Sequence, residues 1–183
     1  MLIRLLDILF SLLGLFFGFP ILIIITIIAY FDTGSPIFRQ VRVGRNKKSF
    51  TLVKFRTMRK DTDSVASHLV SSSSITNFGG FLRKSKLDEL PQLWNVFKGN
   101  MSLVGPRPGL FNQEELTAAR EKCAVFNVRP GITGLAQIKK IDMATPELLA
   151  LTDKQMIESL TLSKYFAYII KTVTGSGFGD AVR

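Results

Sequence analysis

The sequence predicts an α+β fold in which a hydrophobic membrane helix precedes a small domain with a β-hairpin and several amphipathic helices. Three observations predict it. Residues 8–31 contain no charged side chain. Residues 37–58 hold two runs of β-branched and aromatic residues around a glycine turn, which is typical of a hairpin. The second half of the chain carries short apolar patterns at helical spacing.

Composition excludes several classes of protein. With 183 residues, 46% of them hydrophobic and 21% charged, the chain is neither a disordered tail nor a bundle made only of membrane helices. The length suits one modest domain. A single cysteine, Cys123, cannot form an intramolecular disulfide, and with one histidine, His68, no Cys/His zinc site can assemble. We therefore expect a reducing, cytosol-facing location, and we assign His68 no role.

The hydrophobic segment is long enough to cross a membrane as one helix, but Pro20 lies at its centre. A kink there leaves two halves, residues 8–19 and 21–31, each about 17 Å long and too short to cross alone. From the residues, a re-entrant helix and a mildly kinked single span are about equally favoured. A cleavable signal peptide is disfavoured, because the run is too long and no small-residue cleavage site follows it.

Basic residues flank this segment on both sides. Arg4 precedes it, and five cations follow it closely: Arg39, Arg42, Arg45, Lys47 and Lys48. The positive-inside rule therefore favours a cytoplasmic position for both ends. A net charge of +10 also suits contact with anionic membrane lipid.

Residues 37–43 and 49–58 form the two runs of the expected hairpin, joined by a turn at residues 44–47. Lys54 and Arg56 interrupt the second run, and charges of this kind commonly protect an edge strand from aggregation. Residues 61–76 are rich in serine and predict a loop.

Helices are expected at four places in the second half of the chain. Residues 87–97 predict a short amphipathic helix that stops at Lys98 and Gly99. Residues 113–126 and 145–159 are also helical by composition, and Pro146 fits a first helical position. An apolar stripe over residues 162–173 is either core or in contact with the membrane surface. Because such a stripe also permits self-association, a homodimer is compatible with the sequence.

Two neighbouring carboxylates, Asp88 and Glu89, stand at the start of the predicted helix at residue 87 with three cations just upstream. The positive end of a helix and the cations favour the ionised form of both. Such a pair can act as a structural cap, as a Mg²⁺ ligand or as a nucleophile that attacks phosphorus. The residues alone leave all three readings open.

Three arginines, Arg83, Arg107 and Arg129, lie beside proline or glycine turns or a helix start. Arginine binds phosphate oxygens through two parallel hydrogen bonds, so the set predicts a polyanionic ligand such as a diphosphate. Arginines in turns also cap carbonyls. The absence of a GxxxxGK[ST] sequence argues against a P-loop ATPase.

Several motifs in a fixed order carry a family resemblance over nearly the whole chain. They are FRQVRVG at 38–44, KFRTM at 54–58, FLRKSKLDELPQLWN at 81–95, MSLVGPRP at 101–108 and RPGITGLAQ at 129–137. With the hydrophobic segment before them, they resemble the bacterial sugar transferase family, the small monotopic phosphoglycosyl transferases of glycoconjugate assembly.

The resemblance implies transfer of a phospho-sugar from a UDP-sugar to polyprenyl phosphate, giving UMP and a polyprenyl-diphosphate sugar. It also implies a broken helix over residues 1–33 that re-enters the membrane, followed by a catalytic domain over residues 34–183. The location it implies is the cytosolic face of the bacterial inner membrane.

By position, the resemblance makes Asp88 the nucleophile that forms a covalent phospho-sugar intermediate, with Glu89 as the neighbouring acid. It implies Mg²⁺ between Asp88 and the diphosphate. Arg83 and Arg107 match family positions that contact phosphate, and Lys54 and Arg56 lie in the matching Lys-Phe-Arg motif. We expect these four residues to bind phosphate, together with Arg129 in the Arg-Pro-Gly turn.

Two departures from the family pattern stand out. Many members have Ser before the helix-breaking proline, where this chain has Phe19. Many also carry an arginine shortly after Gln137, so its role here falls to Lys139 or Lys140 or is lost.

The competing hypothesis is a non-enzymatic, basic adaptor that binds anionic lipid or nucleic acid at the membrane surface. Its only support is the net charge. The enzyme hypothesis expects no nucleic-acid partner.

Overall fold

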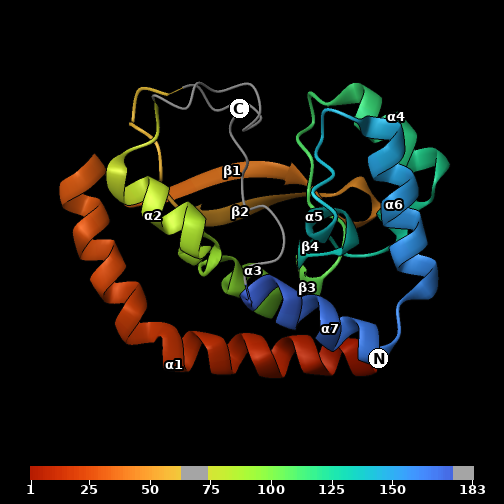
Figure 1. Ribbon diagram of the computed structural model, residues 1–183, viewed down its shortest axis with the longest axis horizontal. Coiled ribbons are helices and arrows are strands. Elements are labelled where there is room, and N and C mark those ends of the chain that lie inside the picture. Colours follow the sequence, from red (N-terminus) through yellow and green to blue (C-terminus); the bar gives the residue numbers. More distant parts are fainter. Residues whose placement is uncertain (63–73, 175–183) are drawn as a thin grey trace.

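The computed structural model describes residues 1–62 and 74–174 (Figure 1). His68 and most of the serine-rich stretch lie outside the described residues. The elements mix helices with a two-stranded antiparallel hairpin and a short parallel pair, which confirms the predicted α+β class.

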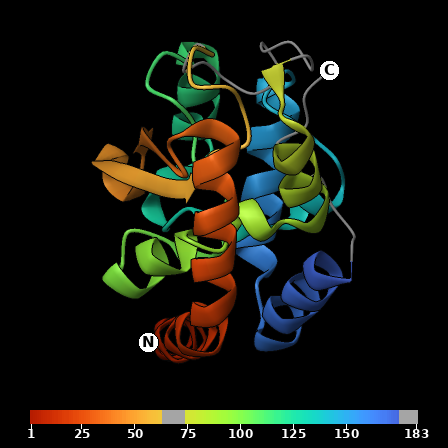
Figure 2. The same ribbon diagram turned by 90° about the vertical axis from the view of Figure 1, so that its left-hand side faces the viewer.

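Helix α1, Leu2–Thr33, is one hydrogen-bonded helix that bends sharply near its middle (Figures 1 and 2). Pro20 is the proline inside it. A proline removes one backbone hydrogen bond and clashes with the preceding turn, so we attribute the bend to Pro20. The helix ends at Gly34, whose left-handed conformation lets its N–H donate to the Tyr30 carbonyl at 2.8 Å. By length and composition, α1 is the helix among the described residues that could cross a membrane.

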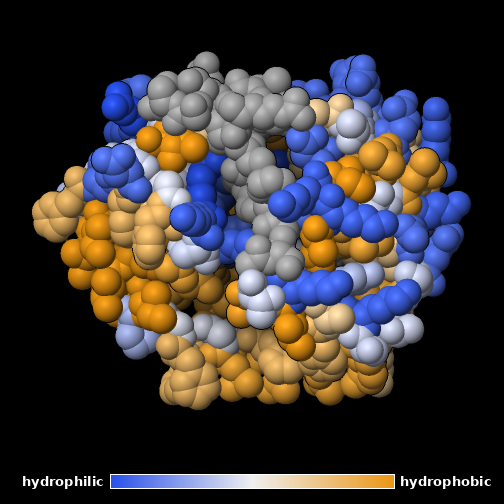
Figure 3. Space-filling view, viewed as in Figure 1, coloured by the Kyte–Doolittle hydropathy of each residue, from blue (hydrophilic) through white to orange (hydrophobic). Residues whose placement is uncertain are grey.

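The bend at Pro20 divides α1 into a first arm before it and a second arm after it, and both arms have an apolar surface. Figure 3 shows hydrophobic residues gathered over the lower and left edges of the molecule, where α1 runs, and hydrophilic residues over α4 and α6. The most exposed apolar side chains of the helix beyond its first residue include Phe16, Phe17, Phe19, Ile24 and Phe31. A soluble domain rarely leaves so continuous an apolar surface uncovered.

Both arms of α1 are bonded to the domain that follows. Near the N-terminus, Arg4 donates to the carbonyls of Val96 and Phe97 at 2.7 and 2.9 Å. At the other end, the hydroxyl of Thr76 donates to Asp32 at 2.6 Å. The two ends of the helix are therefore attached to the same folded unit.

Asp7 makes the most buried of these attachments, with 2% of its surface exposed. One of its oxygens accepts hydrogen bonds from the Ser102 hydroxyl at 3.0 Å, the Leu103 amide at 2.9 Å and the Tyr165 hydroxyl at 2.9 Å. Three donors compensate a buried carboxylate well. The sequence reading did not single out Asp7, because one acid before an apolar run carries no pattern.

The predicted hairpin is confirmed as β1, Ile37–Val43, and β2, Ser49–Phe55, with the short helix η1, Arg45–Lys47, at the turn. Ile37 lies opposite Phe55, and Val43 lies opposite Ser49. The second strand ends three residues earlier than its composition predicted. Phe50 and Leu52 turn inward and pack with Val96 and Met101.

The helix expected over residues 87–97 is instead a 3₁₀ turn, η4, Leu87–Glu89, followed by α3, Gln92–Lys98. Leu90 and Pro91 lie between them with helical backbone angles, and Pro91 has no N–H with which to continue the hydrogen bonds of a helix from η4. Before η4 lies α2, Asn77–Ser85, which begins at Thr76, whose hydroxyl caps the Gly79 amide at 2.9 Å. A Cβ on Gly79 would lie 2.1 Å from the Thr57 carbonyl oxygen, so only glycine lets α2 approach this closely.

A second, separate sheet is a short parallel pair of β3, Ser102–Val104, and β4, Gly131–Thr133. Gly131 meets Gly105 here, where a Cβ would stand 2.0 Å from the Gly105 amide nitrogen. The remaining elements are α4, Glu114–Lys122; η5, Val125–Asn127; α5, Leu135–Ile138; α6, Pro146–Ser159; and α7, Leu162–Val173.

Helix α7 confirms the predicted apolar stripe, part of which is buried in the core and part of which is exposed. Tyr165 and Tyr168 are buried and pack on Val104 and Met156, whereas Ile170 and Val173 are exposed. Phe166 meets Phe10 of α1 edge to face at 6.0 Å between ring centres. The helix is thus core on one side and leaves apolar side chains uncovered on the other.

Candidate active site

Asp88 and Glu89 are both buried, at 1% and 6% exposure, within the single turn η4. The turn is set by Lys86, which adopts a left-handed conformation at φ 59° and whose carbonyl accepts the Glu89 amide at 3.2 Å. A left-handed residue other than glycine costs about 1–2 kcal/mol, so the surrounding packing holds this turn in place. Because η4 packs on β2, both carboxylates lie inside the domain and not on an exposed helix start.

The structure joins Glu89 to Arg107, which lies 18 residues further along the chain. Arg107 donates to Glu89 at 3.0 Å, and its side chain is 23% exposed. Two candidate residues that the sequence singled out separately are therefore partners. Lys86 stands beside the same carboxylate: burial lowers the pKa of its ammonium, and the charge of Glu89 opposes that change.

The turn that carries Arg107 is held at three successive carbonyls by three different elements. The donors are the amide of Gly131 to Pro106 at 2.8 Å, the guanidinium of Arg120 to Arg107 at 2.8 Å, and the guanidinium of Arg42 to Pro108 at 3.0 Å. Such a turn presents its arginine with little freedom.

Arg120 reaches this turn from a buried ion pair. Its Nε and Nη2 donate to one oxygen of Asp153 on α6 at 3.0 and 2.7 Å, and both side chains are at most 3% exposed. Burial raises the pKa of the Asp153 carboxyl, and Arg120 opposes the rise. The sequence reading missed this pair, since an arginine and an aspartate on two separate helices give no local signal.

Three cations converge on a small cavity next to the Glu89–Arg107 pair. Arg42, Lys54 and Arg107 line it together with Gln92, and its volume of about 10 Å³ is that of one water molecule. Lys54 lies 5.6 Å from the centre of the Phe38 ring. The structure thus places Lys54 and Arg107, two of the residues expected to bind phosphate, on one cavity. It adds Arg42, which the sequence showed only as one of the basic residues after the membrane segment.

Two further candidates lie on the hairpin side. Arg83 donates to the Thr57 hydroxyl at 2.8 Å, and Arg56 donates to the Ser35 carbonyl at 2.9 Å while its guanidinium lies 5.4 Å from the Phe38 ring. Both side chains are oriented by these bonds.

The remaining candidates lie elsewhere. Arg129 donates to the Gly99 carbonyl at 2.8 Å, and its charged neighbours are Arg4, Arg45 and Asp7. Burial and the two arginines lower its pKa. Lys139 is exposed and contacts Gln155 at 3.5 Å, and Lys140 is an exposed residue in a left-handed conformation. The structure does not bring these three side chains to the Glu89–Arg107 pair.

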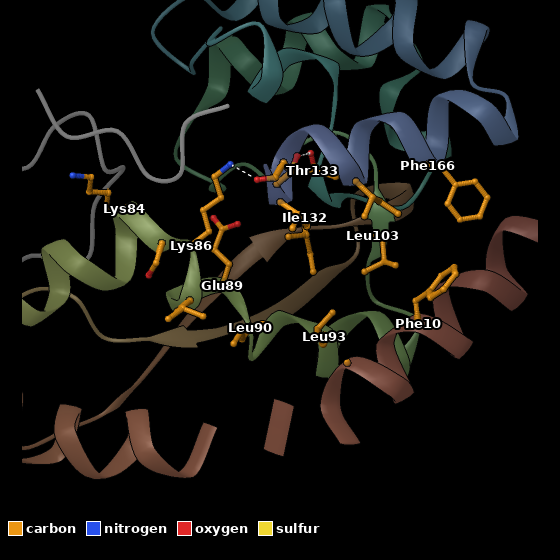
Figure 4. Close-up of a pocket in the computed structure, with 16 residues that line it drawn as sticks. Phe10, Lys84, Lys86, Glu89, Leu90, Leu93, Leu103, Ile132, Thr133 and Phe166 are labelled. Carbon is orange, nitrogen blue, oxygen red and sulfur yellow. Dashed lines mark hydrogen bonds between the residues drawn. The ribbon is translucent and has the colours of Figure 1, made fainter. Parts of the chain in front are cut away.

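A large apolar pocket opens on the other side of Glu89 (Figure 4). Its volume is about 610 Å³, within the range of small-molecule sites. The walls come from α1, α3, α7 and the parallel pair, and the apolar lining includes Leu90, Leu93, Leu103, Ile132 and Ile169. Lys86 and Glu89 lie at one end, and Phe10 and Phe166 lie at the other.

The protein side chains supply only part of the coordination that Mg²⁺ needs. Within residues 1–62 and 74–174, no three acidic, His or Cys side chains cluster as metal ligands. Mg²⁺ in phosphate-transfer sites is characteristically held by one or two carboxylates together with substrate phosphates and water. Asp88, buried next to Glu89 in the same turn, satisfies that requirement.

Comparison with known proteins decides the family. The model of the bacterial sugar transferase family matches residues 1–177. This chain belongs to the bacterial sugar transferase family. It is 33% identical over 171 residues to the exopolysaccharide production protein ExoY of Rhizobium meliloti, covering 83% of this chain and 74% of that protein.

Two other members of the family carry more specific names. The UDP-glucose:undecaprenyl-phosphate glucose-1-phosphate transferase of Caulobacter vibrioides is 35% identical over 84% of this chain and 61% of its own length. The UDP-galactose-lipid carrier transferase of Erwinia amylovora is 36% identical over 84% of this chain and 36% of its own length. This chain therefore spans about a third to three fifths of these two relatives. No relative named here is an adaptor that binds lipid or nucleic acid.

Proposed function

We propose that this protein transfers a phospho-sugar from a UDP-sugar to polyprenyl phosphate, giving UMP and a polyprenyl-diphosphate sugar. One observation carries the proposal: Glu89, one of two neighbouring buried carboxylates, lines an apolar pocket walled by a membrane-type helix and is also paired with Arg107, which lines a small cavity with two other cations. Such a junction suits a reaction between a water-soluble diphosphate and a lipid phosphate. Family membership and the names of two relatives, both sugar-phosphate or lipid-carrier transferases, support it.

In the first step, a carboxylate oxygen of Asp88 attacks the phosphorus that bears the sugar. The bond from that phosphorus to UMP breaks, and UMP leaves with the electron pair. In the second step, an oxygen of polyprenyl phosphate attacks the same phosphorus, and the bond to Asp88 breaks, which restores the carboxylate. Both steps are displacements at phosphorus, so no oxidant or reductant is needed.

Charge around the two phosphates is the main contribution of the protein. Arg107, Lys54 and Arg42 line one cavity that is large enough for a single water molecule, so the diphosphate of the donor would lie outside it. Arg107, whose side chain is 23% exposed, would reach that diphosphate, and the buried Lys54 and Arg42 would add positive charge behind it. Glu89, fixed by Arg107, would hold that arginine in place and keep the site assembled around Asp88.

Asp88, with substrate phosphates, would hold Mg²⁺. When bound, the ion lowers the negative charge that the carboxylate must approach. Asp88 contributes to this site as a buried, ionisable oxygen donor adjacent to Glu89.

The anchor would enter and leave the membrane on the same side. Arg4 and Asp32, near the two ends of α1, are both bonded to the cytosolic domain, and the helix bends between them. A straight helix of 32 residues would be about 48 Å long and would carry its two ends far apart. The exposed Phe16, Phe17 and Phe19 near the bend would reach deepest into the lipid.

The decisive variant is Asp88→Asn, which keeps the shape of the side chain and removes its negative charge. We expect UMP release to fall by at least about a thousandfold. Purified protein in detergent with a panel of UDP-sugars, polyprenyl phosphate and Mg²⁺ is the assay, and Glu115→Gln, which neutralises an exposed carboxylate on α4, is the matched control.

The covalent step has its own measurement. Wild-type protein mixed with the reactive UDP-sugar alone should gain the mass of a phospho-sugar on the peptide that contains Asp88, and the Asn variant should not. Wild-type turnover by Asp88→Asn would refute the nucleophile assignment.

A further inference from the structure

The apolar pocket has one charged end and one end at the membrane-facing helices. Phe10 belongs to α1 and Phe166 to α7, and both aromatic side chains are more than a third exposed. At the opposite end, the Lys86 side chain lies beside Glu89, and its Nζ donates a hydrogen bond to the Thr172 carbonyl at 2.8 Å (Figure 4). A molecule that fills this pocket therefore meets apolar walls along its length and an ammonium at its tip.

Lys86 is fixed in this position by the backbone. Its left-handed conformation ends α2 and starts η4, two residues before Asp88, and its amide donates to the Arg83 carbonyl at 3.2 Å. The backbone of Lys86 therefore keeps a constant relation to the carboxylate pair, while its flexible side chain lets the ammonium move. The ammonium also lies at the carbonyl end of α7, which attracts a cation.

The cations near Glu89 are divided between two spaces. Arg107, Arg42 and Lys54 line the small cavity, whereas Lys84 and Lys86 line the apolar pocket, and Lys86 is the one that stands beside Glu89. Glu89 lines that pocket too and bonds Arg107. A donor phosphate beside Arg107 and a lipid phosphate beside Lys86 would each meet a cation of their own, which limits the repulsion between them and the carboxylates.

We propose that Lys86 binds the phosphate of the lipid acceptor, whose hydrocarbon chain lies in the apolar pocket between Lys86 and the Phe10–Phe166 pair. The occupant is a phosphate monoester of a long single-chain alcohol, because the pocket combines an apolar body with one cationic end. The inference rests on the proposed function and assigns the binding site of its lipid acceptor. A phosphate dianion attracts an ammonium more strongly than a neutral carbonyl does, so binding draws Lys86 from Thr172.

The kinetic test compares Lys86→Met, which removes the charge and retains an unbranched chain, with Lys86→Arg, which retains the charge. Loss of a charge-assisted bond raises the KM for undecaprenyl phosphate by about 10- to 100-fold in the Met variant. The KM for the UDP-sugar stays within about twofold, and the Arg variant recovers most of the lipid affinity. Lys122→Met, an exposed lysine on α4, is the matched control. Equal increases in both KM values, or no increase for the lipid, would overturn the assignment.

A second measurement needs no variant and no turnover. Wild-type protein in detergent is treated with a lysine-acetylating reagent, and modification of Lys86 is quantified by mass spectrometry. Undecaprenyl phosphate should protect Lys86 at least about fivefold relative to its effect on Lys122, whereas undecaprenol and inorganic phosphate should not. Equal protection by undecaprenol, by inorganic phosphate or by phosphatidic acid would overturn the inference.

The two proposals fail in different ways. If Asp88→Asn still turns over while undecaprenyl phosphate protects Lys86, the nucleophile is wrong and the acceptor site stands. If Asp88→Asn is inactive and Lys86 is not protected, the reaction stands and the acceptor site is wrong.

Discussion

Glu89 and its neighbour in sequence, Asp88, are both buried carboxylates. Placing two acids in one turn is costly unless cations compensate them. Arg107 supplies one such cation at 3.0 Å, and its five N–H donors in a planar fork also suit a phosphate. One side chain can therefore hold the acid and reach the substrate, which a lysine with a single charged nitrogen does less well.

Arg107→Lys tests this requirement. The substitution retains the positive charge and loses the fork, so we expect kcat to fall by about 10- to 100-fold while the protein still folds. UMP release and the thermal midpoint in detergent are the two measurements. Arg39→Lys, an exposed arginine on β1, should change neither. A normal rate in the Lys variant would mean that charge alone is sufficient at this position.

The sequence carried the identity of these residues but not their pairing. Asp88, Glu89 and Arg107 each stood in a recognisable motif, whereas the contact between the last two depends on a turn held by Gly131, by Arg42 and by Arg120 from α4. None of those tertiary bonds leaves a periodic trace in the chain. The same applies to Asp7, whose three donors come from two distant elements, β3 and α7.

At the scale of elements, local patterns predicted what local forces build. The hairpin, the helix that starts at Pro146 and the stripe over residues 162–173 were all expected, because alternation or helical spacing is visible within each segment. Helix α2 was missed because it is nine residues long and contains two adjacent glycines. The parallel pair β3–β4 was missed because three-residue strands far apart in sequence show no period.

Helices α4 and α6 illustrate how one pair of elements supports the site from a distance. The Arg120–Asp153 ion pair joins them, and the same guanidinium holds the Arg107 carbonyl. Removing one member of a buried pair leaves the other charge without compensation, which costs more than the pair contributes. The helices therefore position Arg107 without touching the substrate.

For Asp153→Asn we expect a loss of about 3–5 kcal/mol in the free energy of unfolding. The guanidinium of Arg120 would then be buried beside a neutral amide. Denaturant titration in detergent, followed by circular dichroism, measures the loss. Lys154→Met removes one member of an exposed pair with Glu158 at 3.8 Å and should cost less than about 1 kcal/mol. A similar small effect in both variants would show that Asp153 is not needed to balance Arg120.

At the scale of the whole molecule, α1 is long and apolar enough to cross a membrane and is also a wall of the apolar pocket. Phe10 and Gly14 of its first arm line the pocket, and Ile25 of its second arm packs with Phe55 and Leu82 in the core. The helix is thus part of the folded domain along both arms. A helix used in this way cannot extend straight across a bilayer without breaking these contacts.

The bent anchor therefore predicts that both ends of α1 face the cytosol. Cysteines replace Leu2 and Arg39, which are exposed, in a Cys123→Ser background, and a membrane-impermeant maleimide is applied to intact cells and to inside-out vesicles. Both positions should react only in the vesicles, because both lie on the side of the domain. Phe17→Cys, near the bend, should react in neither, since lipid shields it. Labelling of Leu2→Cys in intact cells would place the N-terminus outside, and the helix would then be a span that must release Arg4 and Asp7 from the domain.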